Sequence, residues 1–292
     1  MSRKVHVLVD IRALVGEGAL WDEQAQVLYW VDILSSALYV YNPATGENRS
    51  YDIGQHVGTV VLRDSGGVML ALANGFAEYD LASGKLTILS DPESHLPGNR
   101  FNDGKCDPGG RFWAGTMAYK NQSTQGSLYR MDADYSVHKM LGDIGISNGI
   151  VWSHDKATMY YIDSIAYSVR AFDYDNASGD IANERVAVSV PREMSVPDGM
   201  AIDAQGNLWV AHYGAGCVRC WNPHTGQLLD QIDLPAKQIT SCAFGGENLD
   251  TLFITSAAQQ LDAGALTQQP LAGSLFSVKP GVTGALTYRF AG

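Results

Sequence analysis

Short runs of alternating apolar and polar residues recur along the chain, separated by turns rich in Asp, Asn, Gly and Pro. The run ALYVYN is followed by PATGE, and SVRAFDYD is followed by NASGD. Alternation with a period of two places successive side chains on opposite faces of a strand, and such turns join strands into hairpins. Windows with helical periodicity are nearly absent. The pattern therefore predicts an all-β chain.

One unit repeats along the chain: a polar turn followed by an apolar run that ends in a large residue. The runs end at Trp30, Leu70, Trp113, Tyr161, Trp209 and Phe253, at intervals of 40, 43, 48, 48 and 44 residues. This spacing is typical of four-stranded propeller blades, whereas two β-sandwiches would not explain six units with one period. We expect residues 1–292 to form one domain, a six-bladed β-propeller with four-stranded antiparallel blades.

A strand-like segment from Val5 to Val9 precedes the first unit and belongs to no hairpin. A propeller ring often closes when a strand from one terminus completes the blade made by the other. We therefore expect this N-terminal strand to pair with the last blade, and its removal to destabilise the whole ring.

Charge excludes several classes of partner. The chain has 31 Asp and Glu against 20 Lys and Arg, a net charge of −11, and no window gathers a basic cluster. Nucleic acids and anionic membrane surfaces are therefore poor partners. A surplus of carboxylates suits a bound cation or a neutral polar substrate, although solubility alone explains it equally well. The sequence carries no mark of an oligomeric state.

The N-terminus and the cysteines bear on location and redox chemistry. His6 and Asp10 interrupt the first apolar stretch too soon for a signal peptide or a membrane span, which predicts a cytoplasmic protein. Cys217 and Cys220 form a C-x-x-C pair, which in other settings binds zinc or does redox chemistry. Here the pair lies in a strand-like run, where an offset of three residues directs the two sulfurs to opposite faces.

Polar residues precede the repeated turns at matching places in successive units. They are Glu17, Asn102 with Asp103, Asn148 and Asp198, and Thr240-Ser241-Cys242 stands at this place in the sixth unit. A single Asn-Gly or Asp-Gly pair is more often a turn than a ligand. The innermost strands line one channel, however, so recurrence at one point of the unit indicates a shared site. A following glycine would let the backbone pass closely around a bound ion.

The types of donor atom restrict which metal ion could bind. Glu17, Asn148 and Asp198 would supply two carboxylates and one amide oxygen, with no thiolate and no imidazole. Hard oxygen donors suit Ca²⁺, Mg²⁺ or Mn²⁺ better than a structural zinc. Ca²⁺ is the expected ion, with Zn²⁺, Mg²⁺ and Mn²⁺ as alternatives. Three protein ligands would leave positions open for water and substrate.

Longer motifs of this sequence are similar to those of a known protein family. GEGALWD, NRFNDGKCDPGGRFWAGTM, ISNGIVWS and PDGMAIDAQGNLWVA resemble the senescence-marker-protein/gluconolactonase/luciferin-regenerating-enzyme family, from about Glu17 to the closing RFAG. The resemblance implies a six-bladed propeller with one divalent cation bound by Glu17, Asn148 and Asp198. It also implies substrate contacts from Arg100, Asn102 and Asp103. Members of the family typically hydrolyse sugar lactones, and some bind calcium or act on other esters.

The predicted activity is that of a lactone hydrolase, a gluconolactonase-like carboxylic ester hydrolase. The cation would polarise the lactone carbonyl, and Asp198 is the predicted general base. A cation also lowers the pKa of a neighbouring carboxyl group, so a metal-activated water is the alternative base. Arg100 and Asn102 would donate hydrogen bonds to the substrate, and Asp103 would accept them. No G-x-S-x-G or H-E-x-x-H motif offers a competing nucleophile or zinc site.

The loop Ala118–Gly126 is shorter than in the animal members and lacks the acidic residue that some relatives direct at the sugar. Gln122 and Gln125 are candidate replacements, although exposed loop glutamines commonly face solvent. Two other functions stay open: a calcium-binding regulatory propeller without turnover, and a hydrolase of aryl esters or organophosphates. The fold alone does not name the lactone.

Overall fold

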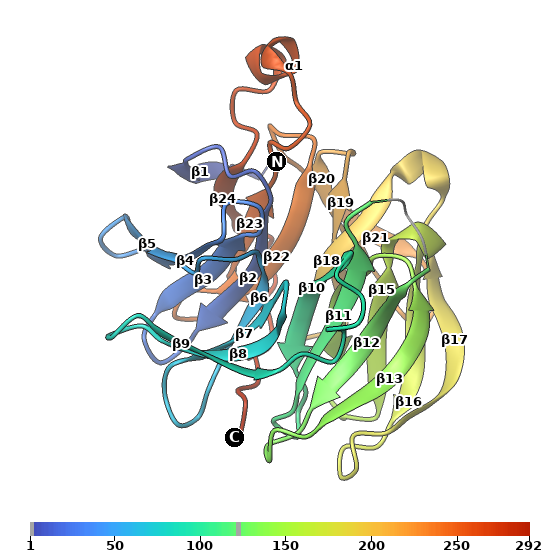
Figure 1. Ribbon diagram of the computed structural model, residues 1–292. Helices are drawn as coiled ribbons and strands as arrows, with labels where there is room; N and C mark the ends of the chain where they lie inside the picture. Colours follow the sequence, from blue (N-terminus) through green and yellow to red (C-terminus); the bar gives the residue numbers. More distant parts are fainter. Residues whose placement is uncertain (1–2, 121–123) are drawn as a thin grey trace.

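The computed structural model describes residues 3–120 and 124–292, and these form six four-stranded sheets around a central channel (Figure 1). Every strand pairing within the sheets is antiparallel. The prediction of an all-β six-bladed propeller is confirmed.

The first three blades follow the chain order. Blade one contains β2 (Gly16–Asp22), β3 (Val27–Asp32), β4 (Ala37–Asn42) and β5 (Glu47–Asp52). Blade two contains β6 (Val57–Leu62), β7 (Val68–Leu72), β8 (Gly75–Asp80) and β9 (Lys85–Ser90). Blade three contains β10 (Asn99–Cys106), β11 (Phe112–Ala118), β12 (Gly126–Met131) and β13 (Val137–Ile144).

Blades four and five continue this order, and two short 3₁₀ helices lie between their strands. Blade four contains β14 (Ser147–Trp152), β15 (Thr158–Asp163), β16 (Ser168–Tyr174) and β17 (Ile181–Ser189). Blade five contains β18 (Val196–Ile202), β19 (Leu208–Tyr213), β20 (Cys217–Trp221) and β21 (Leu228–Asp233). The 3₁₀ helices are η1 (Ser164–Ala166) and η2 (Arg192–Met194).

The sixth blade joins the two ends of the chain. It contains β22 (Ile239–Gly245), β23 (Thr251–Ser256), β24 (Ser274–Val278) and, at its edge, β1 (His6–Asp10). His6 lies opposite Ser277, and Asp10 lies opposite Ser274. The predicted closure by the N-terminal strand is confirmed, with the strand one residue further along than expected. The helix α1 (Ala263–Gln268) projects from the connection between β23 and β24 (Figure 1). Within the described part of the chain, no helix is long and apolar enough to cross a membrane.

The large residue that ends each repeated run becomes core. Trp113 and Trp209 are each the second residue of their strands, β11 and β19, while Trp30 is the fourth residue of β3; all three are fully buried. Each indole N–H finds an acceptor, at 2.8 Å on Asp107 for Trp113 and at 3.0 Å on Asp203 for Trp209. A buried indole needs such a partner, so these turn aspartates satisfy the core as well as shape the turn.

The first strand of each blade contacts the first strand of both neighbouring blades, which closes an inner ring. Because each blade has four antiparallel strands, all six inner strands run the same way through the channel. Their first residues therefore meet at one end of the channel, and their last residues meet at the other.

Each inner strand carries a register irregularity near its start. The shifts lie between Glu17 and Leu20, Val57 and Thr59, Phe101 and Gly104, Ser147 and Ile150, Pro197 and Met200, and Ile239 and Cys242. Bulges redirect side chains and interrupt the ladder. The polar positions noted in the repeat thus coincide with a structural feature of every blade. Asn102, Asn148 and Asp198 occupy the same place in their bulges, and Glu17 lies one residue earlier in its own.

The C-terminal segment covers the opposite end of the channel. The backbone N–H of Phe290 donates to the carbonyl of Leu62 at 2.8 Å, and that of Ala285 donates to the carbonyl of Ile202 at 3.3 Å. Phe290 is fully buried. We call residues 284–291 the C-terminal strap.

Candidate metal and substrate site

The predicted metal ligands meet at the channel end where the inner strands begin. Glu17 on β2, Asn148 on β14 and Asp198 on β18 are all buried. The carboxyl groups of Glu17 and Asp198 lie close enough to share a hydrogen bond. Two carboxyl groups in contact inside a protein repel each other when both are ionised.

Burial and this repulsion favour the protonated carboxyl groups. Burial, followed by the charge of Asp103, raises the pKa of Glu17 to about 8. Burial and the charges of Glu17 and Asp103 raise the pKa of Asp198 well above its ordinary value. A cation between the two groups would reverse both effects, because it favours the ionised carboxylate.

An orphaned oxygen supports a cation at this place. Asp198 is only 6% exposed, and within residues 3–120 and 124–292 its Oδ1 accepts no hydrogen bond from an N–H or hydroxyl donor; its polar neighbour is the carboxyl group of Glu17. An unsatisfied buried carboxylate oxygen is costly, so it indicates a missing partner. Across the same described ranges, no three His, Cys, Asp or Glu side chains form a cluster able to hold a metal. The third protein donor at this site would therefore be the neutral amide oxygen of Asn148.

The orientation of the Asn148 amide is set by Ser164, a residue that the sequence analysis did not identify. Asn148 Nδ2 donates to Ser164 Oγ at 2.8 Å, and Ser164 Oγ donates to the Pro197 carbonyl at 2.7 Å. Because Nδ2 is occupied, Asn148 Oδ1 is the atom that could bind an ion; it accepts one hydrogen bond, from Asn102 Nδ2 at 3.3 Å, and keeps a second lone pair. Ser164 begins η1 directly after Asp163, whose side chain caps η1; this Asp-Ser pair is the only sequence signal for it.

The predicted substrate residues Arg100 and Asn102 lie beside the metal ligands on β10. Arg100 Nη1 donates to the Phe101 carbonyl at 2.9 Å and to Asn102 Oδ1 at 2.7 Å. Asn102 Nδ2 donates to the Ser147 carbonyl at 2.7 Å and contacts Asn148 Oδ1 at 3.3 Å. Arg100 interacts electrostatically with Glu17 and Asp198. The structure thus joins the substrate residues and the ligand residues in one polar network.

Asp103 lies deeper in the channel. It lines a small internal space with Gly18, Thr59 and Ser241, and its Oδ1 accepts a hydrogen bond from the N–H of Gly104 at 2.7 Å. Burial raises the pKa of Asp103, while the charge of Lys105 opposes that shift. The charge of Asp103 raises the pKa values of both Glu17 and Asp198. Asp103 therefore belongs to the same electrostatic group, below the ligand residues.

Two aromatic side chains, Tyr119 and His56, lie near Arg100, and neither was predicted from the sequence to belong to the site. The guanidinium carbon of Arg100 lies 5.8 Å from the centre of the Tyr119 ring. The Tyr119 hydroxyl is 2.7 Å from His56 Nδ1. Burial and the charge of Arg100 lower the pKa of His56, which favours the neutral imidazole. Tyr119 lies in the loop 118–126, at the rim of the site.

The glycines that follow the polar residues serve strand packing. A Cβ on Gly149 would lie 2.6 Å from the Cβ of Met200, and one on Gly199 would lie 2.7 Å from Ser241 Oγ. These contacts are with the inner strand of the next blade. The glycines thus let neighbouring inner strands approach each other, which is a different reason from the ligand clearance expected from the sequence.

The other residues considered from the sequence lie away from this site or outside the described part. Gln122 is outside the described residues, and Gln125 contributes its backbone carbonyl, which accepts from Asn99 Nδ2 at 3.1 Å. Cys217 and Cys220 are free, buried thiols on β20, and burial raises their pKa values to about 11 and about 12. Protonated thiols are poor metal ligands and nucleophiles, so the structure favours packing for this pair.

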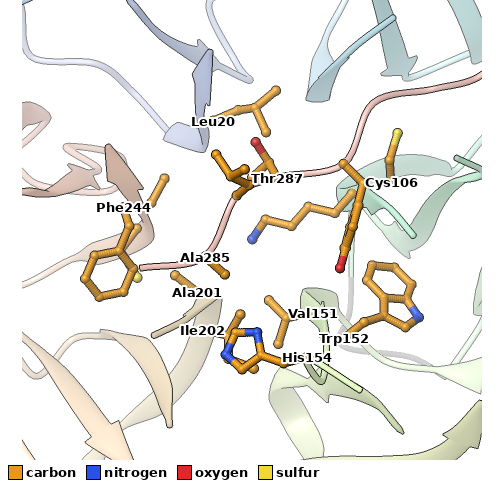
Figure 2. A pocket seen from close by; sticks show the side chains of 15 residues that line it. Leu20, Cys106, Val151, Trp152, His154, Ala201, Ile202, Phe244, Ala285 and Thr287 are labelled. Atoms are coloured by element: carbon orange, nitrogen blue, oxygen red, sulfur yellow. The ribbon is translucent and has the colours of Figure 1, made fainter. Parts of the chain in front are cut away.

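A further cavity of about 50 Å³ lies at the other end of the channel, against the C-terminal strap. Figure 2 shows Leu20, Trp152, Ile202 and Phe244 around it, with Ala285 and Thr287 on the segment that crosses it. None of the predicted ligand or substrate residues lines this cavity. The candidate site and this cavity are therefore separate features at opposite ends of the inner strands.

Most of the chain matches a known protein family. The family described as the SMP-30/Gluconolactonase/LRE-like region matches residues 15–258. The chain belongs to this family. It is 39% identical to regucalcin from Gallus gallus, covering 100% of this chain and 99% of the relative. It is 38% identical to a Bacillus subtilis (strain 168) protein provisionally named sugar lactone lactonase YvrE, covering 97% of each.

Solved structures agree with this membership. A calcium-binding protein from Agrobacterium tumefaciens strain C58, named regucalcin, superimposes with a TM-score of 0.94 at 30% identity, covering 99% of this chain and 97% of its own. The expected family resemblance is thus confirmed over the full length of the chain. The relatives include proteins named for lactone hydrolysis and for calcium binding.

Proposed function

We propose that the protein is a divalent-metal-dependent hydrolase that opens sugar lactones of the aldonolactone type to aldonic acids. The observation that carries the proposal is the buried pair Glu17 and Asp198, with an unpartnered carboxylate oxygen, beside the fixed amide of Asn148 and the guanidinium of Arg100. Membership in a family that includes named lactonases supports it.

Glu17, Asn148 and Asp198 would hold the ion, and Ca²⁺ is the expected one because a related protein is described as calcium-binding. Mg²⁺, Mn²⁺ and Zn²⁺ are the alternatives. When bound, a divalent ion polarises the lactone carbonyl and offsets the negative charge that develops on its oxygen.

Hydrolysis forms one bond and breaks another. The oxygen of water bonds to the carbonyl carbon, the bond from that carbon to the ring oxygen breaks, and the ring oxygen takes up a proton. The second carboxylate oxygen of Asp198, the one that does not bind the ion, would accept a proton from the attacking water. Arg100 and Asn102 would orient the sugar, and Asp103 would accept from its hydroxyl groups.

The test is acid release from a panel of aldonolactones, followed with a pH indicator. Chelated protein is assayed alone and after addition of Ca²⁺, Mg²⁺, Mn²⁺ or Zn²⁺, with Asp198→Asn and Asn148→Ala. Asp143→Asn, at an exposed position on β13, serves as the matched control. We expect turnover restored by metal in the wild type and the control, and a loss of at least 100-fold in Asp198→Asn. Unchanged turnover in Asp198→Asn would refute the proposal.

A second function is favoured by one observation, the description of the related Agrobacterium protein as calcium-binding. A calcium-binding propeller without turnover would bind the ion through the same three residues. If no lactone of the panel is hydrolysed while Ca²⁺ still stabilises the fold, this second function is supported.

A further inference from the structure

Arg100 is a buried cation without an ionic partner among the residues that the structure describes. Arg100 is 8% exposed, and it takes part in none of the ion pairs found in residues 3–120 and 124–292. Residues 121–123 are Asn, Gln and Ser, so they contain no carboxylate. A buried charge is costly unless other charges compensate it, and the nearby carboxyl groups of Glu17 and Asp198 interact with Arg100 without forming an ion pair with it.

The hydrogen bonds of Arg100 occupy only one of its two terminal nitrogens. Both protons of Nη1 are used, at 2.9 Å by the Phe101 carbonyl and at 2.7 Å by Asn102 Oδ1. The Tyr119 ring, 5.8 Å away, covers one face of the guanidinium. Nε and Nη2 have no acceptor among the described residues. These two nitrogens form one planar edge, which is the geometry that binds a carboxylate through two parallel hydrogen bonds.

A divalent ion held by Glu17 and Asp198 would compete with Arg100 for the same two carboxyl groups. The buried group also contains Asp103 and Lys105, whose charges oppose each other. Lys105 Nζ lies in the channel, where it donates to the Met200 carbonyl. An ion bound by Glu17 and Asp198 would therefore leave the guanidinium of Arg100 to pair with an anion from outside the chain.

Such a site attracts a singly charged anion. From these contacts we propose that the preferred substrate is a sugar lactone carrying a second, ionised carboxylate, such as the monolactone of a sugar dicarboxylic acid. Its carboxylate pairs with the Nε and Nη2 edge of Arg100 while its ring carbonyl lies at the metal position. This inference rests on the proposed lactonase function. A phosphate dianion carries one negative charge more than the single guanidinium of Arg100 compensates.

The test compares two lactones that differ only at the far carbon, glucaro-1,4-lactone and glucono-1,4-lactone. In the metal-loaded wild type we expect kcat/KM for the acidic lactone to exceed that for the neutral lactone at least tenfold. Arg100→Gln should reduce this ratio to about one, and Arg100→Lys, which keeps the charge but not the planar edge, should give an intermediate ratio. Arg289→Gln, at the strap end of the channel, is the matched control and should keep the wild-type ratio. As a third substrate, 6-phosphogluconolactone should exceed glucono-1,4-lactone in kcat/KM by a smaller factor than glucaro-1,4-lactone does.

Equal rates on the two lactones in the wild type would overturn the inference, and so would a ratio unchanged by Arg100→Gln. If no lactone is turned over, the proposed function fails and a binding measurement decides the inference separately. Isothermal titration of calcium-loaded protein with glucaro-1,4-lactone and glucono-1,4-lactone should then show at least tenfold tighter binding of the acidic lactone. This difference should be lost in Arg100→Gln; equal binding of the two lactones would overturn the inference.

Discussion

The buried carboxyl pair predicts that metal-free protein loses stability as the pH rises. Glu17 has an ordinary pKa of 4.5, and burial with neighbouring acidic groups raises it to about 8 in the folded chain. A carboxyl group with a raised folded pKa favours folding in its protonated form. Its contribution is therefore complete below pH 4.5 and is lost as the pH rises through 8.

The size of this effect follows from linkage. Each pKa unit corresponds to about 1.4 kcal/mol, and Glu17 is half ionised at pH 8, so the loss from this group is about 4 kcal/mol. Total stabilities of folded domains are about 5–15 kcal/mol, so the change is a large fraction. Asp198 titrates with Glu17 and shifts in the same direction. A bound divalent ion keeps both groups ionised and should remove most of the pH dependence.

The assay is urea unfolding at equilibrium, followed by tryptophan fluorescence, at pH 5 and pH 8 with chelator or with Ca²⁺. We expect chelated wild type to lose about 3 kcal/mol between the two pH values, and Ca²⁺ to restore most of it at pH 8. Glu17→Gln should flatten the pH dependence of the chelated protein and abolish the effect of Ca²⁺. Glu47→Gln, at an exposed position, is the control. A chelated wild type that is equally stable at both pH values, or a Glu17→Gln variant with the wild-type slope, would refute the reasoning.

Three further predictions concern positions outside the ligand set. Asp203→Ala removes the acceptor of the Trp209 indole and of two turn N–H groups, so it should lower the free energy of unfolding by about 3 kcal/mol without changing metal affinity. Ser164→Ala frees the Asn148 amide, so calorimetry should show metal affinity about tenfold weaker, with Ser164→Thr restoring it. Removal of residues 1–10 exposes the β24 edge, and calorimetric melting should show the entire ring destabilised in one transition rather than the sixth blade alone.

The ring architecture is readable from the sequence because every blade repeats the same local pattern. The period-two runs and the recurring Trp, Tyr and Phe positions report burial that each hairpin imposes locally, so the six units and the closing strand are predictable. The bulges are not, since a register shift leaves no mark in an alternating pattern. The placement of Glu17 one residue ahead of Asn148 and Asp198 in its bulge appears only in the structure.

The site is predictable where residue type and position in the repeat coincide, as for Asn148 and Asp198. Ser164 and Tyr119 escape such an analysis because their roles come from contacts across strands and between blades. Ser164 joins Asn148 of blade four to the Pro197 carbonyl of blade five. Tyr119 meets His56, which is 63 positions away in the chain. Single serine and tyrosine residues outside the strands carry no periodic signal.

The proposal that Glu17, Asn148 and Asp198 bind one divalent ion can be tested in a crystal structure with Mn²⁺ located by anomalous scattering. We expect a single strong peak in the channel, about 2.0–2.6 Å from a carboxylate oxygen of Glu17, from one of Asp198 and from Asn148 Oδ1. No peak at these residues in crystals grown with saturating Mn²⁺, or a peak bound elsewhere with the Glu17 and Asp198 carboxyl groups still in contact, would contradict it.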